Sequence, residues 1–461
     1  MEIERSSIIV VGCRIISAGL GFVGTIYYAR KLGPVVLGSF FLLQSLVGIL
    51  GVPADLGVQG ALEKRISEGE DQNQLFTASL FFMSSSFIAI LLSSLLFRKY
   101  INSYLNAPLF WELIALLLVT IFTQLYLSAL RGELKITQSA LLNALASLAT
   151  LTITVALLII GLRIYALIYG ILTGRVAVIL LSSYLVDLSL KRPEKKHFSR
   201  VFSFSKYNMI LRTSGLIYSW TDVVVIGWFL SNAAVGVYEI AWRVSMLSIL
   251  TSDAIANIIF PNFSKLHAED RLPDIERTIP KAITYSMIVP IGIFFGALIL
   301  SENVLSVIYG SSFATGSIVL IILLGERILH SFYKTLFNVT MAFDQPHVAF
   351  RISFISILVN IVLNIVLVPI MGIEGAAVAM LVAYMISAIL YYRHVRREIR
   401  FMLPTRNILW MVASGGIITG LLALFSQYVG EYSIYTLLIT ILTGGLLYFG
   451  IIFILRSSVG D

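Results

Sequence analysis

The sequence predicts an all-α polytopic membrane protein with about 14 transmembrane helices. Of its 461 residues, 58% are hydrophobic and only 13% are charged, and the mean hydropathy is +0.92. Apolar stretches of about 20 residues, long enough to cross a bilayer, follow one another along the chain. The connections between them are short, so we expect no soluble domain.

The apolar stretches place each expected span. In chain order they are 6–29, 36–58, 75–97, 109–130, 138–160, 164–188, 203–229, 234–261, 279–300, 316–340, 347–369, 374–393, 407–427 and 433–455. The first stretch lacks a small-residue cleavage site, so we expect a span there and not a secretory signal peptide. The single cysteine, Cys13, lies inside this span and cannot form an intramolecular disulfide.

The cations of the loops predict the orientation in the membrane. One set of alternate loops carries Lys64, Arg65, Arg131, Lys135, Lys191, Arg192, Lys195, Lys196, Arg200, Lys265, Arg271, Arg277, Arg393, Arg396, Arg397, Arg400 and Arg406. The other set carries only Arg30, Lys31, Arg98, Lys99 and Arg163. Cytoplasmic loops are enriched in Lys and Arg, so the rich set and both termini are expected in the cytoplasm of a cell-membrane protein. The net charge of +8 is explained by these loops and indicates no nucleic-acid partner.

A weak internal repeat predicts two related halves. A slide of 198 residues places LGPVVLGSF (32–40) on LSNAAVGVY (230–238), and a slide of 211 places IIGLRIYALIYG (159–170) on IMGIEGAAVAML (370–381). Both slides keep the span direction, so the repeat is parallel. The predicted domains are an N-lobe of six helices (1–190), a basic cytoplasmic linker (191–202), a C-lobe of six helices (203–400) and two appended helices (401–461).

Arg14 lies about eight residues inside the first span, which is roughly 12 Å at 1.5 Å per residue. A cation at that depth normally faces a partner or a water-filled cavity. The face that it shares with Ser17, Ala18, Gly21 and Thr25 fits either close helix packing or a substrate-lining surface. The first slide of the repeat places Arg14 on Arg212, which would put two arginines at matching depths.

Further ionisable residues lie within the expected spans. The cations are Arg14, Arg175, Arg212, Arg243, Arg327 and Lys334, and the acids are Asp55, Asp222, Glu239, Asp253 and Glu326. Cations outnumber acids, and arginine binds phosphate through a planar bidentate fork. We therefore expect the cations to bind a substrate that carries phosphate or carboxylate groups.

Several of these residues have two open interpretations. Glu239 and Arg243 are four residues apart on one helix, so they form a local ion pair or share Arg243 with a ligand. Asp222 either meets a partner on another helix or couples a cation or proton. Asp55, after Pro53, is favoured as a helix-end cap over a coupling site. Glu326 likewise has a coupling or a structural role.

The tenth span carries a polar stripe. Arg327, His330, Lys334 and Asn338 follow one another at steps of three, four and four residues. This spacing puts them on one helix face, which must line a cavity or meet other helices. The sequence contains no GxxxxGK[ST] loop, no HExxH and no Cys/His cluster, so neither an ATPase domain, an enzyme, a metal site nor a cofactor is expected.

Several motifs resemble one family. They are ARKLGPVVLGSF (29–40), ADLGVQGAL (54–62), TDVVVIGWFLSNAAVGVYEIAWRV (221–244), VIYGSSFATG (307–316) and AFDQPHVAFRISFISILVNIVLNIVLVPIMGIEGAAVAML (342–381). These stretches are similar to the polysaccharide-transporter family, the Wzx-type or O-antigen flippases of the multidrug/oligosaccharidyl-lipid/polysaccharide (MOP) exporter superfamily. In this resemblance Asp222 occupies the family's characteristic aspartate.

The resemblance implies two six-helix lobes in a V, a central hydrophilic cavity and alternating access. The expected cargo is a polyprenyl- or dolichyl-(pyro)phosphate-linked oligosaccharide, moved from the cytoplasmic to the outer leaflet, and the bilayer and the pathway's polymerase or glycosyltransferases are expected partners. Relatives that flip lipid II use cavity arginines to bind the pyrophosphate. By analogy of position, the resemblance implies the same role for Arg14 and Arg212.

Two alternative functions are open, one in the same superfamily and one in a different class. A cation-coupled multidrug exporter of the same superfamily would have a cavity rich in acids, which this sequence does not predict. A membrane glycosyltransferase or polymerase would need long outer loops and a cluster of catalytic acids, and the sequence has neither.

Overall fold

The computed structural model describes the backbone of residues 2–457 and the side chains of residues 6, 8–205 and 220–455. Within these residues every regular element is a helix. This follows from the membrane environment, because a helix pairs its backbone N–H and C=O groups within one segment and leaves none exposed to hydrocarbon. The predicted all-α membrane fold is confirmed.

The chain divides into two compact units, residues 1–236 (unit 1) and residues 237–461 (unit 2). The helices of unit 1 are α1 (Glu2–Asp55), α2 (Val58–Ser67), α3 (Gln72–Leu96), α4 (Arg98–Leu105), α5 (Phe110–Gly132), α6 (Ile136–Ile159), α7 (Arg163–Leu185) and α8 (Lys195–Phe229). Helix α9 (Asn232–Met246) contains the boundary between the units. The predicted linker at 191–202 lies inside unit 1, because the start of α8 packs on α2 and α3.

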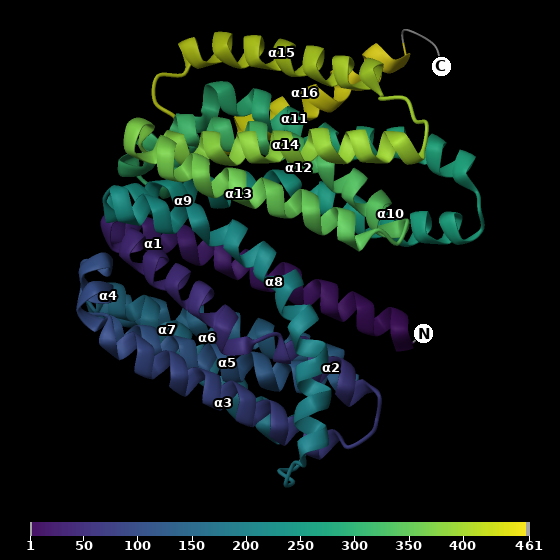
Figure 1. Ribbon diagram of the computed structural model, residues 1–461. Coiled ribbons are helices and arrows are strands. Elements are labelled where there is room, and N and C mark those ends of the chain that lie inside the picture. The colour runs from purple at the N-terminus through teal and green to yellow at the C-terminus, as the bar shows by residue number, and fades with distance from the viewer. Residues whose placement is uncertain (1, 458–461) are drawn as a thin grey trace. The chain divides into compact units, whose positions relative to one another are not determined.

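Unit 2 continues from α9 through the remaining helices. They are α10 (Leu250–Ala268), α11 (Leu272–Tyr309), α12 (Ser317–Ala342), α13 (Pro346–Met371), α14 (Ile373–Glu398), α15 (Thr405–Tyr428) and α16 (Ile434–Ser457), with the short 3-10 helices η1 (Leu247–Ile249) and η2 (Ser311–Gly316). Figure 1 shows α13 and α14 side by side as an antiparallel pair. The apolar core of unit 2 includes Phe263 of α10, Ile283 of α11, Leu336 of α12 and Tyr391 of α14.

Twelve helices among the described residues are long and apolar enough to span a membrane, so the expected count of 14 is not confirmed. The expected spans 6–29 and 36–58 correspond to two helices that meet at a kink at Gly33 and together make up α1. At Gly33 the backbone has φ 71° and ψ 177°, which favours glycine, and Pro34 follows. The expected span 203–229 forms part of α8, where the side chains of 206–219 lie outside the described residues.

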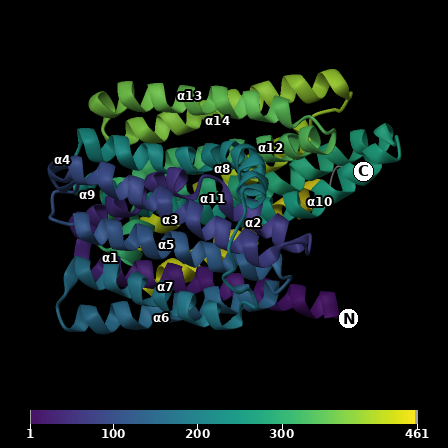
Figure 2. The ribbon, with the colours of Figure 1, turned by 60° about the horizontal axis from the view of Figure 1, so that its bottom comes forward.

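Helices α5, α6 and α7 lie side by side in unit 1, with their long axes close to parallel (Figure 2). Helix α1 packs along α6 and also contacts α5 and α7. The turn between α5 and α6 and the chain after α7 therefore meet at one end of the unit. There Lys135 donates hydrogen bonds to the Leu185 carbonyl at 2.8 Å and to Asp187 Oδ2 at 2.7 Å.

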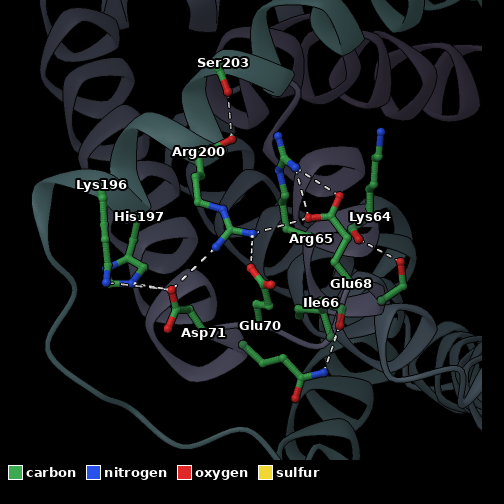
Figure 3. A network of polar contacts seen from close by, with 12 residues as sticks. Lys64, Arg65, Ile66, Glu68, Glu70, Asp71, Lys196, His197, Arg200 and Ser203 are labelled. Atoms are coloured by element: carbon green, nitrogen blue, oxygen red, sulfur yellow. Dashed lines mark hydrogen bonds and ion pairs between the residues drawn. The ribbon is translucent and has the colours of Figure 1, made fainter.

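The start of α8 is tied to the turn between α2 and α3 at this same end (Figure 3). Arg200 Nη2 lies 3.4 Å from both Glu68 Oε2 and Glu70 Oε2, and its Nη1 lies 3.5 Å from Asp71 Oδ2. The buried His197 places Nε2 3.2 Å from the same Asp71 oxygen. One basic helix end thus neutralises three acids, which fixes α8 to unit 1.

A close helix crossing within unit 1 holds the first residues of α9, Asn232 to Gly236, against α1. A Cβ added at Gly38 would stand 1.6 Å from the backbone oxygen of Asn232, and one added at Gly236 would stand 2.1 Å from the Pro34 oxygen. The buried Asn232 amide donates to Ser39 Oγ at 2.6 Å and to the Leu105 carbonyl at 3.1 Å. The absence of side chains at these two glycines is what allows the hydrogen bonds to form.

This crossing predicts that Gly38→Ala lowers the free energy of unfolding by about 1–3 kcal/mol, because the backbone of Asn232 cannot move away without breaking its bonds. Thermal unfolding of the purified protein in detergent measures the change. Gly19→Ala is the matched control, since nothing lies within 4 Å of a Cβ there. Equal melting temperatures for the two variants would contradict the packing argument.

The turn network predicts a pH-dependent stability. Hydrogen bonds from Arg65, and the charges of Arg65, Arg200 and Lys64, lower the pKa of Glu68 below its ordinary value of 4.5. A lowered folded pKa means that ionised Glu68 stabilises the fold above about pH 4.5, and that this contribution is lost as pH falls through the folded pKa.

We therefore expect Glu68→Gln to lower the melting temperature at pH 7 and to have progressively less effect between about pH 5 and pH 3. Thermal unfolding across this range measures it. Glu431→Gln, which removes an exposed glutamate without an ion pair among the described residues, is the control. A pH-independent difference between wild type and Glu68→Gln would count against the network.

Candidate functional site

A cavity of about 380 Å³ lies within unit 1, between α1, the end of α5 and α6. Its lining residues are Val10, Cys13, Arg14, Ser17, Arg131, Ile136, Ser139, Ala140, Asn143 and Ser147. This volume falls within the range of about 300–1,000 Å³ typical of small-ligand pockets. The cavity combines two cations with hydroxyl and amide groups, and none of its lining residues is acidic.

Arg14 is the unusual member of this lining. Its side chain is exposed, and it makes no hydrogen bond or ion pair with any described residue. Helix α1 presents it within an apolar run whose other side chains provide no counter-charge. A guanidinium in that position gains most from an anion that accepts two parallel hydrogen bonds.

Arg131, at the end of α5, is already bound. Its Nε donates to Glu63 Oε2 at 2.8 Å and its Nη2 donates to Ser128 Oγ at 2.8 Å. Glu63 belongs to α2, so the pair also links α2 to α5. The charge of Arg131 is therefore compensated by Glu63 at the cavity wall, while Arg14 keeps its hydrogen-bonding capacity for a ligand.

Sequence reasoning missed the α6 side of this cavity. Ser139, Asn143 and Ser147 recur every four residues in an otherwise apolar span, which places them on one face. The same spacing argument that selected the stripe of the tenth span would have found them. They carry no charge, so ionisable residues in the spans do not point to them.

The other cations expected to bind substrate in unit 1 lie elsewhere. Arg175, on α7, hydrogen-bonds Thr120 Oγ1 of α5, and its backbone oxygen accepts from Thr123 at 3.4 Å. Arg175 therefore joins two helices and does not line the cavity. The side chain of Arg212 lies outside the described residues, although its backbone continues α8.

The acids of unit 1 occupy helix ends and interiors. Asp55 Oδ1 accepts a hydrogen bond from the Gln59 backbone at 3.1 Å, the kind of contact that ties the end of α1 to the start of α2. Asp222, on α8, is 3% exposed. Neither residue lines the α1–α6 cavity.

In unit 2 the expected ligand cations meet acids of their own unit. Arg243 Nη2 lies 2.8 Å from Glu239 Oε1 one turn earlier on α9, and the Arg243 side chain keeps 33% exposure. Arg327 Nη1 lies 3.0 Å from Glu326 Oε2, and both residues are buried. The local ion pair between Glu239 and Arg243, one of their two open interpretations, is present.

Two residues of the polar stripe on α12 hydrogen-bond neighbouring helices. Arg327 Nε donates to Ser245 Oγ at 3.2 Å and its guanidinium lies 5.6 Å from the centre of the Trp242 ring. Asn338 donates to the Ala256 carbonyl at 2.9 Å. These contacts bind α12 to α9 and α10.

The remaining two residues of the stripe face aromatic rings. His330 packs against Tyr333 and Tyr384 with centroid distances of 5.1 and 5.5 Å. Lys334 Nζ lies 5.2 Å from the Phe337 ring centre. The stripe thus meets neighbouring helices, which was one of its two expected environments.

The buried pair predicts that Arg327→Gln lowers the free energy of unfolding by about 3–5 kcal/mol, because Glu326 is left buried without its counter-charge. Arg243→Gln should cost less, because its side chain is one-third exposed. Thermal unfolding in detergent compares them. A double variant Glu326→Gln/Arg327→Gln that is more stable than Arg327→Gln would identify the buried charge as the cause, and an equally unstable one would refute it.

The comparisons with known proteins agree with this architecture. The chain matches the family described as polysaccharide biosynthesis protein over residues 28–318. It is 36% identical over 448 residues to the "Probable low-salt glycan biosynthesis flippase Agl15" of Haloferax volcanii, covering 97% of this chain and 95% of the relative. It is 27% identical over 432 residues to the "Probable flippase AglR" of the same organism, covering 93% and 90%.

Among solved structures the fold is similar to that of the lipid II flippase MurJ in an inward closed conformation. The TM-score is 0.81, with 18% identity and coverage of 98% of this chain and 99% of MurJ. The resemblance that the sequence motifs predicted is confirmed. The chain belongs to the polysaccharide biosynthesis protein family.

Proposed function

We propose that this protein flips a polyprenyl- or dolichyl-linked oligosaccharide from the cytoplasmic to the outer leaflet by alternating access. Arg14 would bind the phosphate or pyrophosphate that joins lipid to glycan. The observation that supports this most is an exposed guanidinium in a polar cavity of a membrane helix, with no acid in the lining. Two relatives described as probable flippases, at 36% and 27% identity, support a flippase, and the name of the first refers to glycan biosynthesis.

An anionic cargo is favoured because the Arg14 guanidinium is costly to keep at membrane depth without a ligand. A cation at membrane depth is expensive unless water, a counter-ion or a partner solvates it. A phosphate gives Arg14 bidentate charge-assisted hydrogen bonds, while the lipid tail stays in the bilayer. The same lining disfavours a cationic drug, because the cavity would repel it.

The other residues receive separate proposed roles. Arg212 and Arg243 are proposed to contact the anionic headgroup or acidic sugars, Arg212 through the repeat and Arg243 through its exposed side chain. The structure gives Arg327, Lys334 and Arg175 internal contacts, so their proposed role is to position helices. Asp222 is the proposed coupling residue, while Glu239, Glu326 and Asp55 hold ion pairs or a helix end.

Reconstitution tests the proposal. A labelled polyprenyl-pyrophosphate oligosaccharide is placed in one leaflet of liposomes, and its accessibility to an enzyme on the other side is followed. Loss of hydrogen bonds to a charged group, worth about 1.5–3 kcal/mol, predicts that Arg14→Ala slows translocation about 10- to 100-fold. Arg14→Lys should retain part of the activity, since it keeps the charge without the fork.

Arg163→Ala is the matched control, because Arg163 is an exposed arginine at the start of α7 that does not line the cavity. Both variants should be as stable as wild type in thermal unfolding. Wild-type rates in Arg14→Ala would remove Arg14 from the mechanism. An equal loss of translocation rate in Arg14→Ala and Arg163→Ala would indicate that the change in net charge, and not the position of Arg14, causes the effect.

A further inference from the structure

The α6 wall of the cavity has hydrogen-bonding capacity that the protein leaves unused. Ser139 is 3% exposed and lines the cavity, yet its hydroxyl makes no hydrogen bond with any described residue. Asn143 uses its Nδ2 on the Ser139 carbonyl at 3.0 Å, which leaves Oδ1 without a donor among the described residues. Ser147 donates to the Asn143 carbonyl at 3.0 Å, which leaves its oxygen lone pairs to accept.

The chemistry of these groups differs from that of Arg14. An amide oxygen only accepts hydrogen bonds, and an ionised phosphodiester also only accepts them. Asn143 Oδ1 therefore cannot bond the phosphate that Arg14 attracts, and the two oxygens would repel. It needs a ligand group that donates, and Ser139, as a hydroxyl, can both donate and accept. Sugar hydroxyls satisfy all three positions.

We propose that Ser139, Asn143 and Ser147 form a glycan subsite that recognises hydroxyl groups of the sugar attached to the phosphate on Arg14. This inference rests on the proposed function and adds to it the part of the substrate that is recognised. A cavity of about 380 Å³ suits the phosphate and the adjoining sugar, and it is too small for a long oligosaccharide. Recognition of the first sugar would leave the rest of the glycan free to vary.

Binding to the purified full-length protein tests the subsite with two probes. One is a polyprenyl phosphate that carries a single hexose. The other is the same polyprenyl phosphate with a methyl group in place of the hexose, so both are phosphodiesters with the same charge. The ratio of their dissociation constants isolates the sugar contribution. Wild type should bind the hexose probe more tightly.

Asn143→Leu, close in size and without the amide, should reduce this preference about threefold to tenfold and leave the affinity for the methyl probe unchanged. Ser139→Ala should reduce it in the same direction. Gln138→Leu is the matched control, because Gln138 is an exposed amide on α6 that does not line the cavity. Arg14→Ala should weaken both probes equally.

Three results would overturn the subsite. They are equal affinity of wild type for the two probes, an unchanged ratio of the two dissociation constants in Asn143→Leu, and a loss of hexose preference in Gln138→Leu as large as that in Asn143→Leu. Thermal unfolding checks that each variant remains folded. If Asn143→Leu does not fold, the ratio of dissociation constants measured for Ser139→Ala tests the subsite instead. Because the readout is binding, absence of translocation in liposomes would count against the proposed function and leave this test in force.

Discussion

Hydrocarbon offers no hydrogen-bonding partner, so every polar group in a membrane-spanning helix needs one inside the protein or in a cavity. The chain meets this constraint for its backbone by folding into helices throughout the described residues. It meets it for most side chains by local bonds, such as Thr25 to the Gly21 carbonyl at 2.8 Å. Other polar residues find a partner on a different helix or lie in a cavity, and these residues join the helices or form the candidate site.

Arg327 and Arg14 show two answers to the same electrostatic cost. Arg327 is 2% exposed and is neutralised by Glu326, with Ser245 and Trp242 completing its surroundings. Arg14 is exposed in a cavity whose lining contains no acid. The guanidinium of Arg327 is already paired within the protein, whereas that of Arg14 is available to bind an anionic ligand. The contrast explains why counting arginines in spans does not identify a binding site.

At the end of unit 1 that carries the α2–α3 and α5–α6 turns, charged side chains also pair with one another, although these pairs are partly exposed. Arg200 meets Glu68, Glu70 and Asp71 there, and Lys135 holds the chain that follows α7. Such exposed pairs contribute little individually, but a network that fixes one helix end can keep its position. The rigid end places the α5–α6 turn, and with it the α6 wall of the cavity.

The sequence by itself determined the class of fold, the positions of nearly all helices and the family, because hydropathy and turn residues are local properties of the chain. It also pointed to Arg14, since an arginine in an apolar run is visible without a structure. Tertiary structure alone decided which cations are neutralised, because Glu63 and Arg131 are far apart in sequence and meet only through packing of α2 on α5. It likewise decided that Ser139, Asn143 and Ser147 line the same cavity as Arg14, because helix packing brings α6 beside α1.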